Sequence, residues 1–337
     1  MAALRESIFP SSLGDVEVRR VEAHPSSLIE LQAPAARFEW PGFARDHGET
    51  VRRLLHSQGA LVLRGFGLDS PEACERFAES LTGGLLEYNE RSSPRHSVHG
   101  RVYTSTDHPA REEIFLHNEN SYRTNWSLTL YFFCLQPAAE GGDTPVADTR
   151  AILRDLDPGV RAEFEQRGWM LQRNFREHVG VPWQTAFNTT DRDVVERYCA
   201  ENGIAFEWRD EGVLRTRAVR KAVHHHPLTG EVVWFNHATF FHVSTLPPRI
   251  REALLACYDE SELPNNTYYG DGIPIEPEVL DHLRERHRAR LTPTRLRKGD
   301  VLVIDNMLYA HGRTPYAGER EVLVAMAEPY RDGQVLH

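Results

Sequence analysis

The chain has 337 residues, of which 40% are hydrophobic and 26% charged, and its formal net charge is −10. The apolar fraction is ample for a sizeable core, and barrel or sandwich folds of this length often form one unit, so we expect residues 1–337 to be a single domain. Every apolar run is shorter than the ~20 residues of a membrane-spanning helix, and the arginines are mostly scattered over an acidic chain, so we expect neither a membrane protein nor a nucleic-acid-binding protein.

The first residues and the cysteines predict the compartment. Residues 1–7 include Glu6 and no apolar segment, so we expect no secretory signal and a cytoplasmic protein. The four cysteines form no CxxC pair and lie in apolar or helical stretches, which favours buried, reduced thiols over disulfides or a zinc site. These cysteines are Cys74, Cys134, Cys199 and Cys257.

Residues 1–110 predict a buttress of helices and one strand, followed by a loop. Apolar positions recur at helical spacing in 43–57, and a short apolar run at 60–63, directly after a glycine, predicts a strand. A Ser-Pro pair opens a second helix at about 70–81, with the serine as N-cap. Residues 87–109 are polar and rich in histidine, which is typical of a loop over an active site.

The most informative motif is the pair His117 and Glu119, one residue apart. The run at 114–116 before the pair and the run at 128–134 after it are rich in β-formers. Because side chains alternate along a strand, we expect His117 and Glu119 to point to the same face. Two imidazoles and one carboxylate make an incomplete metal shell, so a distant histidine could complete a facial triad around Fe(II) with open coordination sites. The spacing alone is weak evidence in a chain with 17 histidines.

A long insertion at 149–298 follows a tight turn at 141–145 that presents the hydroxyl of Thr144. Within the insertion, residues 232–237 resemble a strand that returns to the main barrel. The two phenylalanines at 240–241 are expected in the core or in a pocket wall. The predicted helices of the insertion lie at about 158–167, 191–202, 247–260 and 276–288.

The candidate third ligand is His311, which lies between two strand-like segments at 299–306 and 320–326. Asp305 and Asn306 precede it. They either orient the distal histidine from behind or simply form a turn.

We predict that Arg320 and Thr144 together bind a carboxylate group, as a carboxylate clamp. A guanidinium binds a carboxylate in a bidentate fork that lysine cannot reproduce, and a hydroxyl adds one more hydrogen bond. Arg313 competes with Arg320 for this role.

The remaining histidines are expected to lie outside the metal shell. Three consecutive residues on an extended chain cannot all face one ion, so we expect His224, His225 and His226 on the surface or in the turn before the following proline. His237 and His242 stand beside aromatic residues, and we expect packing or hydrogen bonding for both.

Together these residues resemble the taurine dioxygenase (TauD/TfdA) superfamily of Fe(II)/2-oxoglutarate oxygenases. The stretch HNENSYRTNWSLTLYFFCLQPAAEGGDTPVADTR, which begins at His117, is similar to the clavaminate-synthase-like/SyrP-like subgroup, which acts on amino acids or amino-acid-derived natural products. Two departures from the family pattern are Glu119 in place of the more frequent aspartate and an Arg320 nearer to His311 than usual. Further similar segments, within roughly residues 40 to 330, are Leu63–Phe66, Trp234–Asn236, Tyr268–Gly272 and His311–Arg313.

The strand pattern and the resemblance imply a mainly β fold with flanking helices, a double-stranded β-helix (jelly roll, cupin-like) with a helical insertion. Residues 111–148 would supply the first jelly-roll strands with the metal motif. Residues 149–298 would be the insertion and lid, and 299–331 the final strands with the distal metal ligand.

The resemblance also implies a function. His117, Glu119 and His311 would hold Fe(II) as the catalytic residues, and 2-oxoglutarate and O2 would be co-substrates, with Arg320 and Thr144 holding the far carboxylate of 2-oxoglutarate. The expected reaction is hydroxylation of an unactivated C–H bond of a small molecule, with release of succinate and CO2. The substrate would be an amino acid, free or tethered to a carrier protein, or an amino-acid-derived natural product. Candidate substrate contacts are Asn118, Asn120, Ser121, Arg313 and Arg331.

Two other classes of protein remain open at this stage. One is a cupin-like metal enzyme that does not use 2-oxoglutarate, such as a hydrolase or isomerase, in which Arg320 and Thr144 would have no purpose. The other is a non-catalytic jelly-roll binding module.

Overall fold

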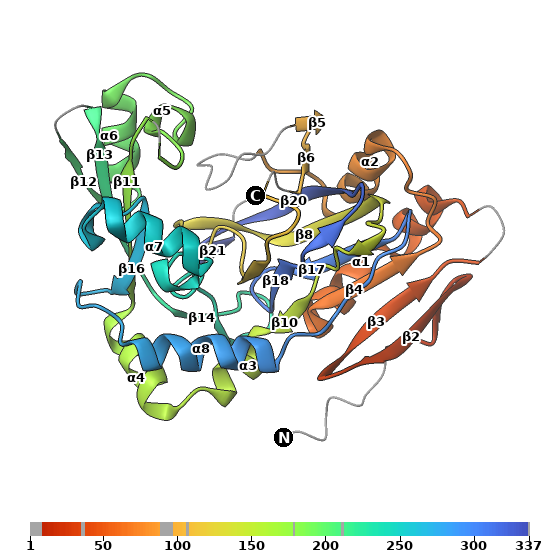
Figure 1. The fold of residues 1–337 in the computed structure, drawn as a ribbon. Coiled ribbons are helices and arrows are strands. Elements are labelled where there is room, and N and C mark those ends of the chain that lie inside the picture. Colours follow the sequence, from red (N-terminus) through yellow and green to blue (C-terminus); the bar gives the residue numbers. More distant parts are fainter. Residues whose placement is uncertain are drawn as a thin grey trace.

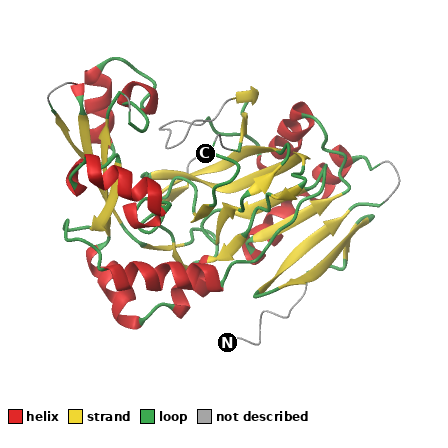
Figure 2. Ribbon diagram, in the orientation of Figure 1, coloured by secondary structure: helices red, strands yellow, loops and turns green. Residues whose placement is uncertain are grey.

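Two β-sheets face each other in the computed structural model, with helices on the outer face of the larger sheet and a long insertion at one end (Figure 1). Figure 2 shows the same arrangement by type of element. The described part of the chain contains no helix that is long and apolar enough to span a membrane. The structure describes residues 9–34, 38–87, 97–105, 108–177, 179–209 and 212–335.

The larger sheet has ten strands in the described residues, and all neighbours are antiparallel except one parallel pair, β3 with β4. The central strands are those that flank the insertion in sequence, as expected for a jelly roll. In spatial order the strands are β1 (Ser12–Leu13), β2 (Val16–Ala23), β3 (Ser26–Gln32), β4 (Ala60–Arg64), β17 (Val301–Asp305), β8 (Asn125–Gln136), β20 (Glu321–Arg331), β6 (Val102–Thr104) and β5 (Ser97–His99), with β21 (Gln334–Val335) beside β20.

The smaller sheet has three strands and carries the candidate histidines. Its middle strand, β18, pairs with β10 on one side and with β7 on the other. A short pair, β9 with β19, lies apart from both sheets. The bounds are β10 (Val146–Asp148), β18 (Tyr309–Arg313), β7 (Ile114–His117), β9 (Glu140–Gly141) and β19 (Tyr316–Ala317).

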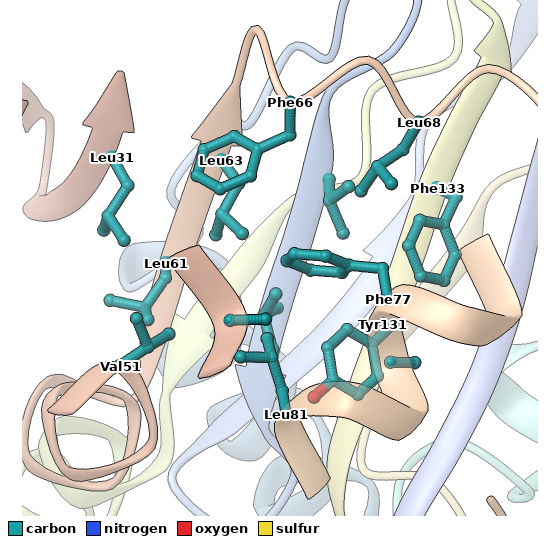
Figure 3. Close-up of a cluster of buried hydrophobic side chains, with 14 of the residues drawn as sticks. Leu31, Val51, Leu61, Leu63, Phe66, Leu68, Phe77, Leu81, Tyr131 and Phe133 are labelled. Atoms are coloured by element: carbon teal, nitrogen blue, oxygen red, sulfur yellow. The ribbon is translucent and has the colours of Figure 1, made fainter. Parts of the chain in front are cut away.

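Strand β8 shows why the larger sheet is buried on both faces. Leu130 and Phe132 point into the roll, whereas Tyr131 and Phe133 belong to the cluster beneath the helices. This alternation follows from the period of two along a strand. Figure 3 shows Tyr131 and Phe133 close to Phe77 of a covering helix. Because both faces are covered, residues 130–135 of the strand form a continuous apolar run instead of an alternating pattern.

The two covering helices are α1 (Trp40–Gln58) and α2 (Pro71–Thr82). The serine N-cap predicted for the second helix is confirmed, since the Ser70 hydroxyl accepts a hydrogen bond from the amide of Ala73. The β2–β3 hairpin was not predicted from the sequence. Part of the predicted loop at 87–109 is instead strand, β5 and β6, while residues 88–96 and 106–107 lie outside the described residues, as do residues 1–8.

The insertion contains the four predicted helices and, in addition, a four-stranded sheet in the order β12-β13-β11-β16. Periodicity did not reveal these strands because polar side chains are buried within them: Arg217 donates to Gln172, and Arg215 donates to Asn174. The strands are β11 (Trp169–Phe175), β12 (Ile204–Trp208), β13 (Leu214–Arg220) and β16 (Asn265–Tyr269), and the helices are α3 (Thr149–Asp155), α4 (Pro158–Arg167), α5 (Trp183–Ala186), α6 (Arg192–Glu201), α7 (Pro248–Cys257) and α8 (Pro277–Ala289).

Three expectations need correction. The segment 232–237 does not return to the barrel, because its strand β15 (Val232–Trp234) pairs with β14 (Val223–His225) in a separate two-stranded ribbon. His224 and His226 are not at the surface but are 7% and 1% exposed, respectively, because His224, in β14, packs against Trp126 and the chain turns inward directly after this strand. Of the four cysteines, Cys257 is exposed, because α7 lies on the outside of the insertion.

Candidate metal centre

His117 and His311 lie opposite each other on paired strands of the smaller sheet. β7 and β18 are in register at these two residues, and the centroids of the imidazole rings are 4.4 Å apart. Glu119 follows two residues after His117, just beyond the end of β7. One ligand atom from each of the three side chains lies within 4.8 Å of the others. The structure thus gathers the three residues named from sequence into one cluster.

The backbone sets the tautomer of His117. Its Nδ1 lies 2.9 Å from the carbonyl oxygen of Phe115. A carbonyl oxygen can only accept, so Nδ1 carries the proton and Nε2 keeps a lone pair. Metal-binding histidines are commonly oriented by such a bond. The donor chemistry of this residue therefore fits a divalent cation.

Asn306 holds the backbone on both sides of Glu119. Its Oδ1 accepts from the Glu119 amide at 2.8 Å, and its Nδ2 donates to the Glu119 carbonyl at 2.9 Å and to the Ser127 carbonyl at 2.9 Å. The Asn118 side chain in turn donates to the Asn306 carbonyl at 2.6 Å. Asn306 was expected to orient the distal histidine or to form a turn. It does lie in the turn between β17 and β18, and its side chain also binds the backbone of the carboxylate residue Glu119.

Arg320 lines the cavity beside the tight turn that carries Thr144, and its side chain is bonded to that turn. Its Nε donates to the Gly142 carbonyl at 3.0 Å, and its Nη2 donates to the Thr144 hydroxyl at 3.3 Å. Burial lowers the pKa of Arg320, and the neighbouring Arg313 lowers it further. An anion beside Arg320 would relieve both effects. Gly142 has φ +72°, and a Cβ there would lie 3.1 Å from the Arg320 Cδ, so the approach requires glycine.

Arg313 also lines the cavity, but its hydrogen bonds go to a different segment from those of Arg320. Its guanidinium donates to three backbone carbonyls, of His108 at 3.0 Å, Pro109 at 2.6 Å and Glu112 at 2.9 Å. It therefore ties the 108–112 segment to β18. These contacts leave Arg320 as the guanidinium better placed to receive a carboxylate.

A cavity of about 640 Å³ opens at the three-residue cluster. One wall is aromatic: the Phe240 ring lies 4.4 Å from that of His117, and the Phe132 ring 4.9 Å from that of His311. The outer wall includes apolar residues on and just before α7, Leu246, Ile250 and Leu254. Polar groups of the cavity include Glu112, Glu113, Asn265, Thr144 and Arg320.

His237 was expected to pack or form hydrogen bonds, and it does both at the cavity wall. Its Nδ1 is hydrogen-bonded to the Ser121 hydroxyl, and its ring stacks on Phe241 with centroids 4.8 Å apart. Burial, together with the nearby His117, holds its pKa well below the usual value, so the ring is neutral. His237, like Glu112, Glu113 and Asn265, is a polar cavity residue that was not predicted from the sequence as a site residue.

The other candidate substrate contacts are not brought to the cavity. Asn118 and Ser121 use their side chains in the bonds described above, and Asn120 accepts a hydrogen bond from the Tyr122 hydroxyl in a turn with φ 59°. Arg331 is exposed at the end of β20. Of the five candidates, only Arg313 lines the cavity.

A jelly roll with two imidazoles and one carboxylate lining a largely apolar cavity is typical of the class of mononuclear non-haem iron enzymes. The family model described as taurine catabolism dioxygenase TauD, TfdA family matches residues 25–326, and the chain belongs to this family. It is a non-haem Fe(II)- and 2-oxoglutarate-dependent dioxygenase with O2 as the second co-substrate. This assignment decides against the hydrolase or isomerase and against the non-catalytic binding module.

Relatives of known name support the family assignment. The dapdiamide synthesis protein DdaC of Enterobacter agglomerans is 38% identical over 283 residues, which cover 83% of this chain and 85% of that protein. A clavaminate synthase-like protein of Arabidopsis thaliana is 26% identical over 290 residues, with 82% and 83% coverage. PvcB from Pseudomonas aeruginosa shares the fold, with a TM-score of 0.57, 16% identity and coverage of 98% of this chain and 99% of PvcB.

Proposed function

We propose that His117, Glu119 and His311 hold the Fe(II) and that Arg320 and Thr144 hold the far carboxylate of 2-oxoglutarate. The convergence of the three side chains at one end of the cavity supports the first part. The second part is supported by the partly buried Arg320 guanidinium, which lines the same cavity, and by its bond to the Thr144 hydroxyl.

Bound Fe(II) supplies the activation of O2 and the oxidative decarboxylation of 2-oxoglutarate to succinate and CO2. The side chains of the protein position the reactants and exclude water from them. The Phe240 and Phe132 rings cover the imidazoles and exclude water from the reacting end of the cavity. Neutral His237 adds a hydrogen-bonding group to this wall without adding a positive charge beside the metal.

We propose that the substrate is an amino acid or an amino-acid-derived natural product, which is hydroxylated at an unactivated C–H bond. The observation that carries this proposal is the 38% identity, over most of the chain, to a protein named for dapdiamide synthesis. The cavity is compatible with such a substrate, because Glu112, Glu113 and Asn265 can receive an ammonium group while the outer wall is apolar. The substrate is either free or tethered to a carrier protein, and the expected cytoplasmic location stays a prediction.

Succinate release tests both proposals. The purified chain is incubated with Fe(II), 2-oxoglutarate and a panel of free amino acids, carrier-tethered aminoacyl groups, sulfonates and aryloxy acids, with His311→Ala as the control. We expect amino-acid substrates to stimulate succinate formation and to give a product one oxygen atom heavier. Stimulation by sulfonates or aryloxy acids alone would overturn the substrate class, and His311→Ala with full activity would overturn the metal site.

A further inference from the structure

A second cluster of buried histidines and a carboxylate lies behind the metal centre. His56 of α1 and His226, directly after β14, both contact the Asp305 carboxylate at the end of β17. The His56 Nδ1 is 2.7 Å from Asp305 Oδ2, and the His226 Nε2 is 2.9 Å from the same oxygen. The three residues are 7%, 1% and 0% exposed, respectively. By composition alone, this cluster could be a second metal site.

The proton positions of His226 argue against a metal ion here. The backbone amide of Thr229 donates to the His226 Nδ1 at 3.1 Å, and the amide of Leu228 approaches the same atom at 3.4 Å. Since Nδ1 is the acceptor, the ring proton sits on Nε2 and is donated to Asp305. A metal ion on Nε2 would require an imidazolate, which has lost both ring protons. The cluster is therefore held by hydrogen bonds.

His56 carries a positive charge between two carboxylates. Its Nδ1 faces Asp305, and its Nε2 lies 3.5 Å from Glu328, which also binds Arg52 and the Thr129 hydroxyl. Burial alone would lower the pKa of His56, but the bonds to Asp305 and Glu328 raise it to about 9. Burial would raise the pKa of Asp305, and the His226 and His56 bonds lower it to about 2. A charged network of His56, His226 and Glu328 thus surrounds Asp305.

The second oxygen of Asp305 fixes the turn that leads to the metal centre. Its Oδ1 accepts from the amides of Met307 at 3.0 Å and Leu308 at 3.1 Å, which locks residues 305–308 between β17 and β18. Asn306 lies inside this turn, and its side chain holds the backbone of Glu119. The two imidazoles are therefore connected with the carboxylate residue of the metal centre through hydrogen bonds to Asp305, the backbone of the 305–308 turn and the hydrogen bonds of Asn306.

We propose that His56 and His226 are positioning residues for the metal-binding carboxylate: they hold Asp305, which fixes the 305–308 turn, and Asn306 in that turn places Glu119. This inference rests on the proposed metal role of Glu119. The two imidazoles come from the N-terminal helix layer and from the ribbon of the insertion, so both layers contribute to the geometry of one ligand. Loss of such an outer contact typically weakens metal affinity by about 10- to 100-fold.

Mn(II) affinity, measured by titration with electron paramagnetic resonance, tests the proposal alongside thermal unfolding. We expect His226→Leu to weaken Mn(II) binding by at least about tenfold, and His226→Gln, which keeps an N–H donor, to recover most of it. The matched control is His224→Leu. His224 is a 7% exposed imidazole of the same ribbon, and its Nε2 bonds to the Lys221 carbonyl at 3.3 Å, away from Asp305.

The outcomes separate positioning from general destabilisation. Support requires that His224→Leu keeps wild-type Mn(II) affinity, even where it lowers the melting temperature. Equal losses of affinity in the two leucine variants, or none in His226→Leu, would overturn the inference. If His226→Leu does not fold, Asp305→Asn takes its place: it keeps an acceptor for the turn amides and loses one for the imidazoles, so we expect the same loss of affinity.

Metal stoichiometry tests the alternative reading of the cluster. We expect one Mn(II) or Zn(II) per chain in the wild type and none in Glu119→Ala. Tight Zn(II) binding that persists in Glu119→Ala and disappears on adding His226→Leu would overturn the inference, because the second cluster would then be a metal site. A wild-type chain that binds neither ion would overturn the proposed function itself, and the inference with it.

Discussion

Replacing Arg320 by alanine should weaken 2-oxoglutarate binding by about a hundredfold or more. The side chain is a partly buried guanidinium on the cavity wall, already oriented by the Gly142 carbonyl and the Thr144 hydroxyl. Removing one partner of a buried charged pair costs about 3–5 kcal/mol. At about 1.4 kcal/mol per tenfold, this range corresponds to roughly a hundredfold up to several thousandfold in affinity.

The assay measures the dissociation constant of 2-oxoglutarate from the Mn(II)-loaded protein. The apparent KM for 2-oxoglutarate, measured by succinate release, is a second readout. Arg313→Ala is the matched control: it removes an equally cationic cavity residue whose three bonds go to the 108–112 backbone, so we expect lower stability and a small change in affinity. Thr144→Val should weaken the binding free energy of 2-oxoglutarate by about 0.5–1.5 kcal/mol, the value of one neutral hydrogen bond. A larger loss in Arg313→Ala than in Arg320→Ala would refute the reasoning and transfer the clamp to Arg313.

Three further predictions follow from the fold and the two clusters. Glu119→Asp keeps the charge and shortens its reach, so Mn(II) affinity and turnover should both fall; unchanged values would show that the site tolerates a displaced ligand. Phe133→Ala removes a fully buried ring under the helices and should cost about 3–5 kcal/mol in chemical denaturation without changing the KM for 2-oxoglutarate. The pKa of His56 is raised from 6.5 to about 9. The stability it contributes is therefore complete below pH 6.5 and is lost as pH rises through about 9, so the unfolding free energies of wild type and His56→Leu should converge in that range. A difference that stays constant from pH 6 to pH 10 would contradict a charged His56.

The metal cluster could be predicted because its residues belong to local patterns. His117 and His311 sit in or beside apolar runs of strand length, and strand pairing then brings them together. The turn at Thr144 and the start of the strand after Arg320 were likewise visible as local signals. Local patterns of this kind depend only on the period of a strand and on turn chemistry.

The supporting contacts could not be predicted because they join distant segments through side chains alone. The partner of His226 lies 79 residues away and that of His56 lies 249 residues away, so no spacing relates them. The insertion sheet was missed for a related reason. Its strand β11 buries Gln172 and Asn174 against arginines of the neighbouring strand, so its pattern of polarity is not that of a half-buried strand.

The outer wall of the cavity has a consequence for exchange of small molecules with solvent. Helix α7 contributes Ile250 and Leu254 to that wall, yet none of its residues is buried. A helix that buries so little has a small free energy of local opening, whereas we expect the buried central strands of the larger sheet to open only with the whole domain. We therefore expect backbone amides of α7 to exchange with deuterium far sooner than those of β8 or β17. Because α7 buries so few side chains against the rest of the protein, it can move and change the shape of the cavity without disturbing the jelly roll.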